Sequence, residues 1–180
     1  MVTQTGAALI VGLIVLTTLT LLGLSGMRTA QVEERMAGNF RDRSLAFQGA
    51  EAALRDAEAY LKAADLPPFD GSVPELIGQL AGPGSAAYWS KYDWANNSRQ
   101  AGTTQAGLDE PPRYVIEALA APLAADESRK FGPLPEPDLF RVTSRSTGGS
   151  GTALVILQST VQRRFTFTGG TIRRSWRQLR

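Results

Sequence analysis

The sequence predicts an α+β fold in which one long N-terminal helix packs on a small antiparallel β-sheet. Two observations lead to this class. An uncharged apolar run continues without proline into a charged helical pattern, and strand-like segments gather in residues 113–163. With 180 residues, the chain has room for one domain of ordinary size and an appendage.

Residues 7–27 predict a transmembrane helix. These 21 residues carry no charge, and a helix of that length spans about 30 Å, the thickness of a bilayer core. A cleavable secretory signal is the competing interpretation, because Leu24-Ser25-Gly26 offers small residues to signal peptidase. Against it, the preceding segment MVTQTG lacks the basic residues that such signals carry.

Residues 28–62 predict an amphipathic second half of the same helix. Apolar residues recur there at intervals of three, four or seven: Val32, Met36, Phe40, Phe47, Ala50, Leu54, Ala57 and Leu61. This spacing forms one stripe along a helix. We expect the rest of the chain to pack on the stripe over residues 32–61 and to leave residues 7–27 free for lipid or other helices.

Residues 63–112 predict a long irregular αβ loop, with short helices near 73–81 and 84–92. Three strands are expected after it, at 113–119, 139–146 and 152–162. The glycine-rich segment 147–151 reads as the turn of a hairpin. The economical arrangement is an antiparallel sheet of three or four strands with its apolar face on the helix.

The amino-acid composition excludes several classes of functional site. There is no cysteine, which excludes disulfides and thiolate metal sites, and no histidine, the commonest general base. Asp93 with Asn96 and Asn97 lacks the spacing of a calcium loop. We therefore expect no enzyme, no metal and no cofactor, and we read that segment as a solvated loop and Glu136 with Asp138 as part of an exposed, proline-stiffened connector.

The charges are distributed unevenly along the chain. No acidic residue follows Asp138, so the last 42 residues carry +8 and leave −6 for the first 138. The basic tail, 164–180, interleaves arginines with Phe165, Phe167 and Trp176. We expect a poorly ordered extension. Arg173 and Arg174 remain candidates for contact with a partner or anionic lipid, whereas nucleic acid is not the favoured ligand.

Two aromatic residues of the loop, Trp89 and Trp94, have two open interpretations. They could form a contact with a partner protein, since tryptophan is enriched at the centre of interfaces. Such residues are slightly more often the local core that a long loop needs.

Three stretches resemble the PilX family of type IV pilus minor pilins. The first reads MRTAQVEERMAGN over residues 27–39, the second comprises Arg41-Asp-Arg43 and AFQGAEAAL at 46–54, and the third is RVTSRSTGGSGT at 141–152 leading into LVILQST at 154–160. The resemblance implies a type IV pilin-like fold. It also implies a structural subunit of the initiation or tip complex, which supports pilus assembly, twitching motility and adhesion.

The resemblance extends to the N-terminus. Gly6 before the apolar run resembles a prepilin peptidase site, with cleavage between Gly6 and Ala7 and methylation of Ala7. Residues 1–6 would be the leader peptide, although the family's leader normally carries Lys or Arg, which puts the start codon in question. Val11 takes the fifth mature position, where major pilins carry a glutamate that pairs with a neighbouring subunit's amine. Its absence favours a starter or tip subunit.

The resemblance also implies partners and a location. The partners are other minor pilins, the tip adhesin, the major pilin and the prepilin peptidase. Before assembly the chain would be a single-pass inner-membrane protein with a periplasmic domain, and afterwards part of the pilus at the cell surface. A type II secretion pseudopilin and a membrane-anchored or secreted periplasmic ligand-binding domain stay open as alternatives.

Overall fold

A computed structural model describes residues 6–63, 66–80, 82, 84–103, 105–119, 139–164 and 170–180. Several expectations fall outside these ranges. They concern the first residues of the leader, the connector with Glu136 and Asp138, and the phenylalanines at 165 and 167.

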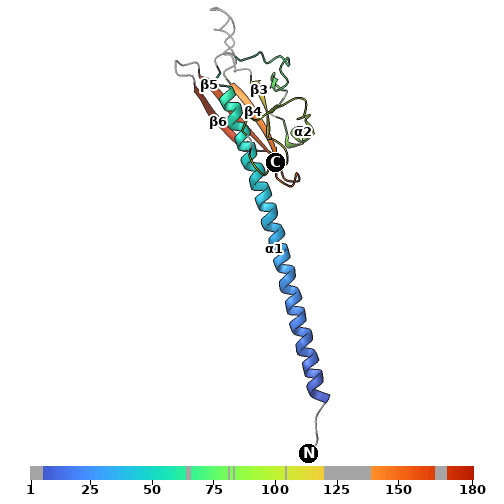
Figure 1. The fold of residues 1–180 in the computed structure, drawn as a ribbon. Helices are drawn as coiled ribbons and strands as arrows, with labels where there is room; N and C mark the ends of the chain where they lie inside the picture. Colours follow the sequence, from blue (N-terminus) through green and yellow to red (C-terminus); the bar gives the residue numbers. More distant parts are fainter. Residues whose placement is uncertain are drawn as a thin grey trace, which may run out of the picture. The chain divides into compact units, whose positions relative to one another are not determined.

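Helix α1 spans Gly6–Tyr60 and is one uninterrupted helix of 55 residues (Figure 1). The long N-terminal helix predicted from the lack of proline is therefore confirmed. Residues 1–41 and residues 42–180 form two compact units, so α1 contributes its first part to one unit and its last part to the other.

The second unit contains a single six-stranded sheet. Its strands are β1 (Leu76–Ile77), β2 (Arg99–Gln100), β3 (Arg113–Leu119), β4 (Leu139–Thr147), β5 (Leu154–Arg164) and β6 (Gly170–Gln178). The order is β1-β3-β4-β5-β6, with β2 also paired to β3. The α+β class is confirmed, with two differences. The sheet has six strands where three or four were expected, and β1 pairs with β3 in parallel, so the sheet is mixed.

The loop that precedes β3 differs from its prediction at one of two helices. Helix α2 (Ala86–Lys91) forms within the expected range, and the hydroxyl of Ser85 caps it by accepting from the backbone N–H of Tyr88. The prediction of a helix near 73–81 is wrong. Leu76 lies fully buried and pairs with Ile116 as β1, because the sheet offers backbone partners that the loop cannot supply by itself.

The C-terminal strand β6 corrects the expectation of a poorly ordered tail. Residues 170–178 pair antiparallel with β5 over most of its length. The pairing shifts by one residue, because Ser175 lies opposite Thr160 whereas Arg173 lies opposite Val161. Arg174 is therefore the extra residue of a β-bulge, which interrupts the alternation that identifies a strand in a sequence.

Alternating side chains place a separate core on each face of the sheet. Toward α1 the core contains Leu54, Ile116, Val142 and Leu157. The helix approaches closely through small residues: a Cβ on Gly49 would lie 2.4 Å from Ser146 Oγ. On the far face Trp89, Trp94, Val115 and Ile156 form the second core.

The apolar stripe of α1 is covered only in its second half. Ala50, Leu54, Ala57 and Leu61 are buried. The expectation that this chain also covers the stripe from residue 32 is wrong, since Val32, Met36 and Phe40 are 54%, 65% and 77% exposed. Helical spacing identifies a common face but not the atoms that cover it.

Candidate assembly surfaces

The first unit presents an apolar helix surface. Between Leu9 and Met27, the large hydrophobic side chains are each 49–77% exposed. Within the described residues, α1 is also the one helix long and apolar enough to cross a membrane. A continuous surface of this kind is unfavourable in water and indicates contact with lipid or with other helices.

The threonines of this segment do not make it polar. The hydroxyls of Thr17, Thr18 and Thr20 each donate a 2.7 Å hydrogen bond to the carbonyl four residues earlier. Their polar groups are thereby satisfied inside the helix, which leaves the methyl groups outside. These three hydroxyls consequently stay hydrogen-bonded whether lipid or protein surrounds the segment.

The residues predicted for processing and assembly lie at the start of this surface. Gly6 is the first residue of α1 and Ala7 follows it in the helix. The side chain of Val11 is 59% exposed. Cleavage at Gly6, methylation of Ala7 and the assembly role of Val11 remain predictions.

The exposed stripe of Val32, Met36 and Phe40 extends the apolar surface beyond residue 27. Because these residues recur every four positions, they share one side of the helix. None of them contributes to either hydrophobic core of the described chain. The structure thus leaves three large apolar side chains available for a neighbouring molecule.

In the second unit, Asp42 fixes the hairpin between β4 and β5 to α1. Its Oδ1 accepts from the Ser150 backbone N–H at 3.0 Å, and its Oδ2 accepts from the Ser150 hydroxyl. These hydrogen bonds lower the pKa of the Asp42 carboxyl below its usual value. A Cβ on Gly148 would lie 2.3 Å from Asp42 Oδ1 and 2.7 Å from its carbonyl oxygen, so the turn approaches as only glycine permits.

This contact joins two of the stretches that carry the family resemblance. Asp42 belongs to the segment 41–43 and Ser150 to the segment 141–152, and the two residues are 108 positions apart in the sequence. Neither residue was among the candidate site residues predicted from the sequence. The glycine-rich turn was the available signal, but it does not reveal which helical residue would face it.

Strand β6 is held to α1 by charge and by aromatic packing. Arg173 Nε donates to Glu58 at 2.7 Å, and its guanidinium lies 3.7 Å from Glu51. Burial alone would lower the pKa of Arg173, but the hydrogen bond and charge of Glu58, together with Glu51, raise it. Trp176 donates to Glu51 at 2.6 Å, and its ring meets Phe47 edge-on at 6.1 Å.

The bulge at Arg174 makes this attachment possible. Arg173 and Trp176 are three positions apart, and strict alternation would place them on opposite faces of β6. The extra residue between them restores both side chains to the face that meets α1. Arg174 itself turns to the neighbouring strand, where its Nε donates to Gln162 at 2.9 Å.

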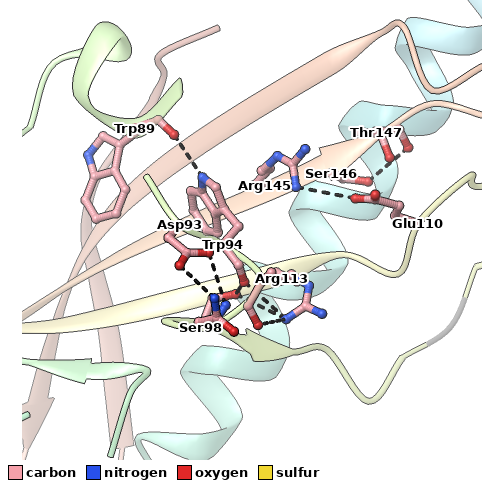
Figure 2. A network of polar contacts seen from close by, with 11 residues as sticks. Trp89, Asp93, Trp94, Ser98, Glu110, Arg113, Arg145, Ser146 and Thr147 are labelled. Atoms are coloured by element: carbon pink, nitrogen blue, oxygen red, sulfur yellow. Dashed lines mark hydrogen bonds and ion pairs between the residues drawn. The ribbon is translucent and has the colours of Figure 1, made fainter. Parts of the chain in front are cut away.

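The two tryptophans of the loop are buried. Trp89 is fully buried and Trp94 is 5% exposed, and Trp94 Nε1 donates to the carbonyl of Trp89 at 2.8 Å (Figure 2). Arg113 donates to the carbonyl of Trp94 at 3.2 Å and so ties the loop to β3. Both rings therefore pack between the loop and the far face of the sheet, while the nearby Tyr88 is 42% exposed.

The polar loop after Trp94 uses its groups internally. Asp93 accepts from the backbone N–H of Asn96 at 3.3 Å and from its side-chain amide at 2.8 Å. These hydrogen bonds lower the pKa of Asp93. Throughout the described ranges, no cluster of three or more Asp or Glu residues could hold a metal ion.

A buried ion pair fastens the loop to the far face of the sheet. Glu117 is 1% exposed and lies 3.0 Å from Arg141. Its other contact is the backbone N–H of Leu80, which donates at 2.9 Å. One carboxylate thus joins β3, β4 and the loop.

Comparisons with known families match most of the chain. The profile of the family described as PilX N-terminal matches residues 5–55, and that of Type IV pilus assembly protein PilX C-term matches residues 44–163. The second match includes the loop 63–112, for which the motifs showed no resemblance. Searches of curated proteins and of solved structures gave no match.

Proposed function

Because this chain belongs to the PilX family of type IV pilus assembly proteins, we propose that it is a minor pilin of the complex that initiates the pilus and remains at its tip. The observation that carries the proposal is the apolar surface of α1, from Leu9 to Phe40, which the described chain leaves exposed. A pilus subunit needs such a surface twice, first in the membrane and then among the helices of other subunits.

Val11 supports a starter or tip role over a repeating one. A carboxylate at this exposed position would require a compensating cation in an apolar bundle. Valine requires none, so the subunit can enter a bundle without a matching amine above it. Gly6 and Ala7 would be the processing site, and the globular unit would be periplasmic before assembly.

The proposed role is structural. Membership in a family of pilus structural proteins fits the internal use of the charged groups described above. Arg173, Glu51 and Glu58 attach a strand, Asp42 holds a hairpin, and Glu117 fastens a loop. Each of these groups performs a packing task, and we assign none of them to chemistry.

The proposal is tested by deleting the gene and counting surface pili, with twitching and protein secretion measured in parallel. We expect fewer pili, lost twitching and normal secretion. Lost secretion with normal pili would instead identify a type II pseudopilin.

A matched pair of point variants addresses the helix surface. Phe40→Ser should reduce piliation without unfolding the chain, because Phe40 is 77% exposed. Arg35→Ser, in the same helix, is the control and should retain pili. Equal piliation in both variants would contradict a role of the apolar stripe in assembly.

A further inference from the structure

The two outer edges of the sheet differ. One edge ends in β1 and β2, which contain two residues each. The other ends in β6, which contains nine residues and pairs only with β5 within the described part of the chain (Figure 1). A short edge strand leaves few backbone groups with which another chain could pair, whereas a long edge strand offers a row of unpaired backbone groups.

The direction of the free groups follows from the hydrogen bonds at the end of β6. Leu179 donates its backbone N–H to Ile156 at 2.8 Å, toward β5. Since successive residues of a strand direct their backbone groups to alternate sides, the N–H of Gln178 points away from β5. The backbone N–H of Trp176, two residues earlier, also points away from β5. The outer side of 175–178 therefore presents donors and acceptors to solvent.

The charges beside this edge indicate which kind of partner would bind there. Arg174 donates to Gln162 and Arg177 donates to Gln158, both neutral side chains. Among the described residues, no carboxylate forms an ion pair with either arginine. Both guanidinium groups thus contact neutral glutamine oxygens, and both residues are exposed. Pairing of two β6 edges would bring arginines together, which disfavours a second copy.

A groove lies at the end of the same strand. It has a volume of about 810 Å³ and is lined by Leu80, Tyr88, Arg177 and Leu179 together with Ser85 and Ala86. Arg177 thus belongs both to the edge segment 175–178 and to the groove, and Leu179 of the groove follows directly after β6. A strand added beside β6 would place alternate side chains on the far face, next to Arg177 and the mouth of the groove.

We propose that the outer edge of β6 binds an extended acidic segment of a partner protein by strand addition, with one apolar side chain of that segment entering the groove. Backbone hydrogen bonds supply affinity in this mode, and side-chain pockets supply specificity. The proposal concerns binding alone and does not depend on which assembly the chain enters.

The test uses the full chain in detergent and a fluorescent end-capped peptide of eight residues. The peptide alternates threonine with glutamate, and one glutamate position is replaced by leucine. We expect saturable binding. Exchange of its glutamates for lysines, or N-methylation of alternate backbone amides, should each weaken binding at least tenfold. Binding that survives N-methylation would overturn strand addition.

Variants of the protein locate the site. Gln178→Pro removes the outward N–H at an edge position where proline is tolerated, and Gln178→Ala is its control. We expect binding to fall at least tenfold for the proline variant alone. Arg177→Ala should weaken binding, whereas Arg55→Ala, an exposed arginine on α1, removes the same charge and should not.

Folding and self-association are controlled separately. Circular dichroism must show wild-type spectra for Gln178→Pro; if it does not, Arg177→Ala and the N-methylated peptide decide the question. A dimer of the wild type that Gln178→Pro abolishes would assign the edge to a second copy and contradict the proposal. Normal piliation with no peptide binding would reject the binding site while leaving the proposed pilus role intact.

Discussion

The strongest stability prediction concerns the ion pair of Glu117 and Arg141. Glu117→Gln preserves the volume of the side chain and an oxygen that can accept from Leu80, but it leaves the Arg141 charge without its counterion. Both partners are largely buried, with side-chain exposures of 2% and 17%. Removal of one partner of a buried pair costs about 3–5 kcal/mol, and the retained acceptor favours the lower end.

The same chain contains a matched control. Glu110 forms an ion pair with Arg145, also on β4, at 3.4 Å, but its side chain is 56% exposed. Exposed pairs contribute about 0–1 kcal/mol, so Glu110→Gln should scarcely change the free energy of unfolding. The substitution is chemically identical, and burial is the main difference between the two pairs.

The assay is urea unfolding of the full chain in detergent, followed by tryptophan fluorescence. A loss of about 3 kcal/mol shifts the midpoint by roughly 1–3 M urea at ordinary slopes. The double variant Glu117→Gln with Arg141→Gln should cost less than the sum of the single ones, because no uncompensated charge remains. Equal midpoints for Glu117→Gln and Glu110→Gln would refute the argument from burial.

Three further predictions concern the attachments of the sheet to α1. Gly148→Ala should destabilise by about 1–3 kcal/mol, since its Cβ would overlap Asp42, whereas Gly170→Ala, with open space around it, should not; thermal unfolding compares them. Asp42 stabilises the fold fully above its usual pKa of 3.8, and this contribution disappears as the pH falls through its lowered pKa. In the acid range, the melting temperature of Asp42→Asn should therefore fall less with decreasing pH than that of the wild type. An unchanged dependence on pH would contradict the contact. Trp176→Ala should cost about 1–2 kcal/mol in urea, because the half-exposed ring loses its contacts with Phe47 and Glu51, and an unchanged midpoint would argue against that docking.

The sequence was sufficient for the elements that follow a simple period. The absence of proline and of charge predicted α1, and alternation of apolar and polar residues over 139–146 predicted β4, which spans Leu139–Thr147. The strand-like composition of residues 113–119 predicted β3 with the bounds that it has in the structure, Arg113–Leu119. The hairpin turn at 147–151 followed from its glycines. These are local properties, which a sequence records directly.

The parts that could not be predicted depend on distant contacts. β6 was missed because the bulge at Arg174 interrupts its alternation and because its arginines resemble those of a solvated tail. β1 has two residues and exists only through its pairing with β3. The contact of Asp42 with Ser150 joins residues 108 positions apart, and no spacing rule identifies such a pair.

The loop tryptophans illustrate the same limit for the candidate site. Composition alone could not decide between a partner contact and a local core, because aromatic residues serve in both. The structure buries Trp89 and Trp94 against Val115 and Ile156. The partner surface that we propose instead uses Arg177 and the outer edge of β6, which no motif had indicated.

The central claim is that this chain is a processed pilus subunit, and the mass of its mature N-terminus tests it most directly. We predict that the protein recovered from cells begins at Ala7 and carries one added methyl group on its amine. Gly6→Ala should leave the leader attached. A mature protein that begins at Met27 would identify a cleaved secretory signal and would contradict the account.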